Sequence, residues 1–149
     1  MKILVLIDGS MWSHKAAMYA LQFARKKGAE IVLFSVLDKR ESKSMAFNFC
    51  NQSNICDRIE NYESQIWRDM RRSINDEMTQ MLIQLGKKGI SATSKIVEGD
   101  VVGEIIREVN DGGYSLVIMG ASGKHARSTL STLFVSISNE VNIPLFIAH

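Results

Sequence analysis

The sequence predicts an α/β domain, in which helices cover both faces of a parallel β-sheet. Short runs of β-branched residues and leucine alternate with longer segments whose apolar residues recur every three or four positions. The strand-like runs are apolar throughout, as in strands that are buried on both faces. The length of 149 residues, with 46% hydrophobic and 23% charged residues, fits one globular domain over residues 1–149.

Five segments are predicted to be strands, and most of them are short apolar runs. They lie at Lys2–Asp8, Glu30–Leu37, Ser91–Val97, Ser115–Gly120 and Ile143–Ala148. The first strand ends in the turn-forming residues Asp8, Gly9 and Ser10. Because a helical segment precedes each later strand, the order predicts right-handed crossovers and a doubly wound, five-stranded parallel sheet.

Four segments show the apolar spacing of helices. They lie at 16–24, from Ile55 to about Gly86, at Val101–Val109 and at Ser128–Val141. Lys26, Lys27 and Gly28 end the first of them, as cations and a glycine do at a helix C-terminus. The apolar stripe of the long helix includes Met70, and we expect this side chain in the core.

Cys50 lies within a polar region between the second strand and the long helix, and Cys56 lies just after it. Lys39–Asn54 mixes both signs of charge and lacks periodicity, which predicts a mobile loop. Cys50 and Cys56 are not spaced as in redox or zinc motifs, and a domain of this size folds without a disulfide, so we expect free thiols. No pair of histidines or carboxylates has metal-binding spacing, and we expect no metal site.

Net charge and the length of the apolar runs exclude several classes of partner. Eighteen basic and sixteen acidic side chains give a net charge of +2, which is too small to indicate nucleic acid or an anionic membrane. Asp8 interrupts the first apolar run, and no run approaches the roughly 18 residues of a membrane span. We therefore expect a cytoplasmic domain with an unidentified protein partner and with no nucleic-acid or membrane partner.

Two loops after strands are candidates for a binding site, because ligands of open α/β sheets bind at the carboxyl ends of strands. In Asp8–Gly9–Ser10, the Asp8 carboxylate suits a ribose hydroxyl or an amino group; the alternative is an ordinary helix start capped by Ser10. In Gly120–His125, two glycines let backbone amides approach an anion, and Lys124 adds positive charge. Glycines also mark ordinary strand-to-helix turns, so both interpretations stay open.

Several motifs occur together, in one order along the chain. They are Asp8-x-Ser10, Ser35–Asp38, Val97–Asp100, Leu116–Gly120 followed by Gly123, Ser138-x-x-Val141 and Pro144–Ile147. Through these motifs the sequence resembles the universal stress protein family over essentially its whole length. The resemblance implies an adenine nucleotide alpha hydrolase-like sheet in the order 3-2-1-4-5, a homodimer and, in one branch of the family, bound ATP with Mg²⁺.

The resemblance also implies roles for single residues. In ATP-binding members, the positions of Asp8 and Val36 contact the nucleoside, and those of Met119, Gly120 and Gly123 line the phosphate pocket. The candidate binding residues of this chain are Asp8, Ser10, Val36, Met119, Gly120, Gly123, Lys124 and Ser136. The sequence contains no Walker lysine motif and no positioned general base, so we expect no catalytic residue and at most slow ATP hydrolysis.

One position departs from the family pattern. Nine residues after the second glycine the pattern asks for Gly-Ser or Gly-Thr, and here the count reaches Leu133–Phe134. A shift of two residues gives Val135–Ser136, which supplies a hydroxyl but no glycine, and a branched side chain obstructs a phosphate. Two functions therefore stay open: a regulatory domain that binds an adenine nucleotide, and a nucleotide-independent dimeric interaction module of the same fold.

The last strand, Ile143–Ala148, lies at a sheet edge in the inferred order. It is apolar, and Pro144 alone blocks pairing near its start. A two-fold contact between two such edges protects both of them, because the contact is self-complementary. We therefore expect a homodimer that forms through Ile143–Ala148.

Overall fold

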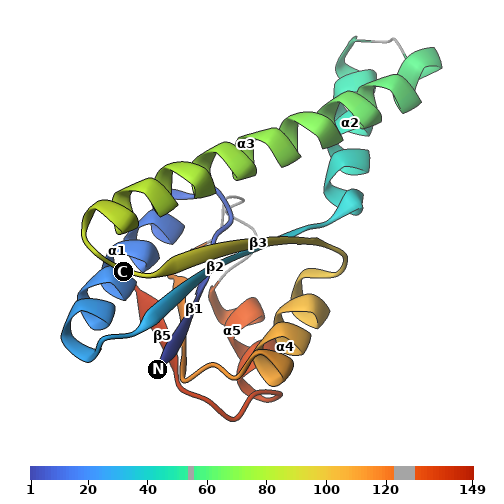
Figure 1. The fold of residues 1–149 in the computed structure, drawn as a ribbon. Helices are drawn as coiled ribbons and strands as arrows, with labels where there is room; N and C mark the ends of the chain where they lie inside the picture. The colour runs from blue at the N-terminus through green and yellow to red at the C-terminus, as the bar shows by residue number, and fades with distance from the viewer. Residues whose placement is uncertain (54–55, 123–129) are drawn as a thin grey trace.

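The computed structural model describes residues 1–53, 56–122 and 130–149, and a five-stranded sheet forms its centre (Figure 1). The strands are β1 (Lys2–Leu6), β2 (Glu30–Leu37), β3 (Ala92–Glu98), β4 (Leu116–Gly120) and β5 (Leu145–Ala148). All neighbouring strands pair in parallel, in the order β3-β2-β1-β4-β5. The predicted fold class and strand order are confirmed.

Helices cover both faces of this sheet, and each face has its own apolar core. On one face lie α1 (Met11–Lys27) and α3 (Ile59–Lys87), and on the other lie α4 (Val101–Gly112) and α5 (Leu130–Ser138). Alternate residues of β1 enter the two cores: Ile3 and Val5 pack toward α1 and α3, whereas Leu4 packs toward α4 and α5. Among the described helices, none combines the length and apolar character that crossing a membrane requires.

The ends of α1 follow the signals in the sequence. The Ser10 hydroxyl accepts a hydrogen bond from the Ser13 amide at 3.2 Å and caps the N-terminus. Gly28 ends the helix with a φ of 67°, a left-handed conformation that glycine adopts without strain. The turn after β1 thus fixes where α1 begins, directly beside the carboxyl end of the sheet.

The expectation of a mobile loop at Lys39–Asn54 is wrong, because Lys39–Ser53 forms the helix α2. The buried face of α2 consists of Ser42, Ala46 and Cys50, at intervals of four residues. These side chains are small or polar. The sequence therefore lacks the large apolar residues, recurring every three or four positions, that would have predicted this helix. The helix packs against α3, and together their ends extend beyond the sheet (Figure 1). Residue 54 lies outside the described residues.

The expectation of free thiols is also wrong, because Cys50 and Cys56 form a disulfide. Their Cα atoms are 4.8 Å apart, within the range of roughly 4.4–6.8 Å that disulfides require. Cys50 is buried in α2, and the exposed Cys56 begins the short 3₁₀ helix η1 (Cys56–Arg58) before α3. The disulfide therefore joins the end of α2 to the start of the next helical segment.

Candidate functional site

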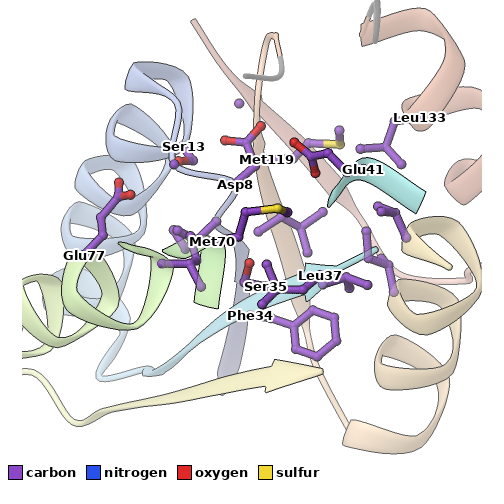
Figure 2. Close-up of a pocket in the computed structure, with 18 of the residues that line it drawn as sticks. Asp8, Ser13, Phe34, Ser35, Leu37, Glu41, Met70, Glu77, Met119 and Leu133 are labelled. Carbon is purple, nitrogen blue, oxygen red and sulfur yellow. The ribbon is translucent and has the colours of Figure 1, made fainter. Parts of the chain in front are cut away.

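A cavity of about 500 Å³ lies over the carboxyl ends of β1, β2 and β4 (Figure 2). The winding of the chain reverses between β1 and β4, which pair directly in the register Val5↔Ile118. Open α/β sheets bind their ligands at such a switch point, because the loops after the two strands diverge there. The loops after the first and fourth strands therefore border one cavity.

The walls of the cavity come from both faces of the sheet. We call the wall toward α1 and α3 the α3 side; its lining residues are Ile7, Ser13, Ser35, Leu37, Met70, Ser73, Ile74 and Glu77. We call the opposite wall the α4 side; its lining residues are Leu6, Phe34, Val36, Val101, Ile105 and Leu133. The α4 side is apolar throughout, whereas the α3 side carries three hydroxyls and a carboxylate.

The structure brings most of the candidate binding residues to this cavity. The candidates that line it are Asp8, Val36, Met119, Gly120 and Ser136. Ser10 does not line the cavity, and instead caps α1 and orients Asp8. Gly123 and Lys124 lie outside the described residues.

Asp8 takes part both in the turn after β1 and in the cavity wall. Its Oδ1 atom accepts hydrogen bonds from the Ser10 amide at 2.9 Å and from the Ser10 hydroxyl at 2.5 Å. An aspartate that bonds the backbone two residues onward is typical of tight turns. The helix-start interpretation and the binding interpretation are therefore compatible, because the Ser10 hydroxyl, which caps α1 by accepting from the Ser13 amide, also donates to Asp8 and holds the carboxylate at the cavity.

Gly120 lies where α1 meets β4. A Cβ atom at this position would be 2.6 Å from the Trp12 Cβ and 2.7 Å from the Trp12 carbonyl carbon. The close approach that requires a glycine here is therefore that of the first turn of α1. From the sequence we expected a glycine here so that an anion could approach the backbone. Among the described residues, the group that approaches it is Trp12.

Sequence reasoning missed the contribution of α2 and α3 to the cavity. Glu41 and Met45 reach it from α2, and Met70, Ser73 and Glu77 reach it from α3. Met70 was expected in the core, but it lies half-buried at the cavity (Figure 2). No sequence signal identifies these residues, because their role arises from the packing of two helices across the strand ends.

The described lining is acidic. It includes the carboxylates of Asp8, Glu41 and Glu77, and no lysine or arginine occurs among the lining residues that the structure describes. Glu77 Oε1 lies 3.4 Å from His14 Nε2, an ion pair when His14 is protonated. This part of the wall favours ligand groups that donate hydrogen bonds or carry positive charge.

An ion cluster joins the end of β2, the start of α2 and the start of α4, and its members are not among the lining residues of the cavity. The Arg40 guanidinium donates to Asp38 Oδ2 at 2.5 Å and to Asp100 Oδ1 at 2.8 Å. Its hydrogen bonds lower the pKa of Asp38, against the opposing effect of partial burial. Since Asp100 also caps α4 through the Gly103 amide, Arg40 connects the end of β2 to the start of α4.

The departure from the family pattern lies in α5, whose Leu133 is on the α4 side of the cavity. Leu133, at the position where the pattern has glycine, lines the cavity. Ser136 lines it as well, so the hydroxyl that a two-residue shift supplies does reach this wall. A leucine side chain adds apolar surface where a bare backbone would present an amide.

The parallel sheet and the cavity at its switch point define an α/β domain of the doubly wound class. The model of the Universal stress protein family matches residues 1–48 and 57–142. The chain belongs to the universal stress protein family. Universal stress protein MJ0577 of Methanocaldococcus jannaschii is 26% identical over 125 residues, which cover 83% of this chain and 77% of that protein.

Solved structures agree with this fold. The structure of MJ0577 superposes with a TM-score of 0.78 at 22% identity, covering 99% of this chain and 94% of the other. A universal stress protein from Arabidopsis thaliana, solved with AMP bound, gives a TM-score of 0.60 at 14% identity over 99% and 90% of the two chains. A universal stress protein in complex with cAMP gives 0.57 at 13% identity over 100% and 96%.

Proposed function

We propose that this chain is a regulatory domain that binds an adenine nucleotide in the cavity at the switch point. The observation that carries the proposal is the placement of Asp8 and Val36 on a cavity of about 500 Å³. Cavities of roughly 300–1,000 Å³ with apolar walls and a few polar groups are typical of small-molecule sites. The AMP and cAMP in the two relatives belong to those proteins and favour the same class of ligand here.

The lining residues suit the parts of such a ligand differently. The apolar α4 side, which includes Val36, suits a flat base, and the Asp8 carboxylate suits ribose hydroxyls. The Ser136 hydroxyl and the backbone at Gly120 suit the phosphate end. Because the described lining is acidic, Mg²⁺ would supply positive charge at that end when ATP binds.

Calorimetric titration of the purified protein with AMP, and with ATP and Mg²⁺, tests the proposal. We expect saturable binding that weakens by about tenfold in Asp8→Ala, because a hydrogen bond to a charged group contributes roughly 1.5–3 kcal/mol. Asp57→Ala, on the exposed η1 turn away from the lining residues, is the matched control and keeps the affinity. The absence of binding at millimolar nucleotide would refute the proposal.

The second candidate is a nucleotide-independent interaction module. The observation that favours it is Leu133, whose presence in the cavity replaces the backbone of the family glycine with apolar surface. Under this function, Leu133→Gly leaves the affinity for AMP unmeasurable. Under the first function, the same change strengthens the binding of the phosphate end.

We also propose that two copies of the chain pair through β5. This strand pairs with β4 on one side and forms the edge of the sheet on the other. Val117 donates to the Pro144 carbonyl and Ala121 donates to the Ala148 carbonyl, so these groups face β4. Because successive residues of a strand point to opposite edges, the peptide groups of Leu145 and Ile147 face outward and are available to a second chain.

A further inference from the structure

Little apolar surface holds the helix α2 in place. Its buried residues are Ser42, Ala46 and Cys50. Its two aromatic side chains, Phe47 and Phe49, are 56% and 50% exposed. A helix of 15 residues is marginally stable by itself and depends on its packing. The groups that fix the two ends of α2 therefore matter more than its buried face.

Charged groups hold the start of α2. The Arg40 guanidinium donates to Asp38, which follows β2, and to Asp100, which caps α4. Lys39 Nζ lies 5.5 Å from the centre of the Trp67 ring of α3. The Arg40 and Lys39 side chains are exposed, and water screens such contacts. They fix where α2 begins but contribute little to its stability.

A covalent bond holds the end of α2. Cys50 is joined to Cys56 of η1, directly before α3 begins. Next to this disulfide, the rings of Phe49 and Tyr62 are in contact, with centroids 5.0 Å apart. The match to the family model stops at residue 48 and resumes at residue 57, so both cysteines lie outside the matched residues. The disulfide is therefore a feature of this chain that the family match does not carry.

The two cysteines differ in exposure, which decides how the bond can be opened. Cys50 is 1% exposed, whereas Cys56 is on the surface. Thiol–disulfide exchange requires that a thiolate reach one of the sulfur atoms, and Cys56 offers that access. In a cytoplasmic domain, which the sequence predicts, disulfides are usually transient or redox-sensing.

The helix that this bond holds also forms part of the cavity wall. Glu41 and Met45 line the cavity from α2, and Figure 2 shows Glu41 among the lining residues. From there α2 runs outward beside α3, to the end that the disulfide holds (Figure 1). A movement of α2 away from α3 therefore changes the wall of the cavity.

We infer that the disulfide between Cys50 and Cys56 is a redox switch, which holds α2 against α3 and thereby keeps Glu41 and Met45 at the cavity. Reduction loosens α2 and weakens the binding of a ligand in the cavity. The effect on nucleotide affinity rests on the proposed function, whereas the loosening of α2 does not.

A dithiol reductant opens the switch in two exchange steps. One thiolate of the dithiol bonds the Cys56 sulfur, the bond between the cysteines breaks, and Cys50 leaves as a thiolate that takes up a proton. The second thiolate of the dithiol then displaces Cys56, which also takes up a proton. Two electrons have passed to the protein, and the dithiol is left as a disulfide.

The first test is whether the bond opens in the folded protein. The protein is incubated with millimolar dithiothreitol in the absence of denaturant, freed of reductant, and its thiols are counted in denaturant with a thiol-reactive dye. We expect no thiol before this treatment and both cysteines as thiols after it. A bond that opens only in denaturant is a structural cross-link, and this result overturns the inference.

Hydrogen exchange of the backbone amides measures whether reduction loosens α2. At short exchange times we expect the α2 amides to exchange about tenfold faster in the reduced protein, because a freed helix end opens locally. The amides of α4, on the opposite face of the sheet, keep their rates at these times. Equal α2 rates in the oxidised and reduced proteins overturn the inference.

Cys56→Ser is the variant that separates the bond from the reductant. It removes the disulfide and leaves the buried Cys50 side chain in place. We expect its α2 amides to exchange as fast as in the reduced wild type and not to respond to dithiothreitol. Gln52→Ala, an exposed change on α2 that keeps the bond, retains the wild-type response.

Calorimetric titration with AMP connects the switch to the cavity. We expect the affinity to weaken several-fold on reduction, and Cys56→Ser to bind AMP as the reduced wild type does in both conditions. If AMP binds in neither redox state, the proposed function is wrong, and the exchange rates of α2 still decide whether the disulfide holds the helix. If AMP binds equally in both states, the proposed function stands and redox control of the cavity is refuted.

Discussion

Trp12 packs over Gly120 so closely that a Cβ atom on the glycine would be 2.6 Å from the Trp12 Cβ. The contact joins the first turn of α1 to the end of β4, the two elements that border the cavity at the switch point. The position of α1, and with it the turn that holds Asp8, therefore depends on the absence of a side chain at residue 120.

Gly120→Ala tests this relationship. The added methyl group must displace the backbone of α1, so we expect a loss of about 1–3 kcal/mol in the free energy of unfolding. Urea denaturation measures the loss. Gly86→Ala is the matched control, because a Cβ at this helical glycine meets nothing within 4 Å, and we expect a gain of roughly 0.5–1 kcal/mol. Equal stability of the Gly120→Ala and wild-type proteins would contradict the contact.

The disulfide between Cys50 and Cys56 leads to a second prediction. It closes a short loop of sequence separation 6, and the loss of such a cross-link costs about 2 kcal/mol in the free energy of unfolding. Because Cys50 is buried in the folded chain, the thiols are counted in denaturant. We expect a thiol-reactive dye to detect no free thiol before reduction and two afterwards, and the Tm of the folded protein to fall on reduction. The Tm of the double variant Cys50→Ser, Cys56→Ser does not respond to reductant. Two reactive thiols in the denatured, unreduced protein would disprove the disulfide.

The two helices over the cavity illustrate what the sequence predicts and what it does not. β1, β2, β4 and β5 carry continuous apolar runs and α3 an apolar stripe, and these segments were predicted close to their observed bounds. The edge strand β3 (ATSKIVE) is mostly polar and largely exposed. The buried stripe of α2 contains Ser42 and Ala46, whose burial depends on contact with α3 and not on apolar character. A helix of this kind is stabilised by tertiary packing, which a local pattern does not record.

The residues that line the cavity also show that a local sequence pattern does not record tertiary packing. Asp8 and Val36 were predicted because they follow strands whose ends meet at the switch point. Ser35 and Met70 were not, because a serine within an apolar strand and a methionine within an apolar stripe are ordinary when each element is considered alone. Their facing positions arise from the crossing of α3 over β2.

Tyr114 provides a prediction about pH. Burial and its hydrogen bond to Glu108, at 2.7 Å, raise the pKa of Tyr114. Burial also raises the pKa of Glu108, but the hydrogen bonds from Lys95 and Tyr114 outweigh it and lower that pKa below its ordinary value of 4.5. Since the ionised Glu108 is favoured in the folded state, its contribution to stability is present above pH 4.5 and disappears as the pH falls through the lowered pKa.

We therefore expect Tyr114→Phe to lower the free energy of unfolding by about 1 kcal/mol at neutral pH. The difference from wild type becomes smaller in acid, and again in strong alkali as the pH rises through the raised pKa of Tyr114. Denaturation curves across the pH range measure it. Tyr62→Phe is the control, because no described group hydrogen-bonds the Tyr62 hydroxyl and its ring contact with Phe49 survives the change. A pH-independent difference for Tyr114→Phe would show that the hydroxyl acts through packing alone.

The edge of β5 leads to the last prediction, and the packing of its side chains decides which substitution tests it. Phe146 lies against Tyr19 and Phe23 of α1, with ring centroids 5.4 and 5.6 Å apart, so changing Phe146 would also disturb the core of a single chain. Ile147→Pro instead removes an amide that faces away from β4, which an edge strand tolerates. We expect light scattering to detect a dimer for the wild type and a monomer for Ile147→Pro. Ile147→Val keeps the amide and the dimer, and a dimer of Ile147→Pro would exclude pairing through this edge.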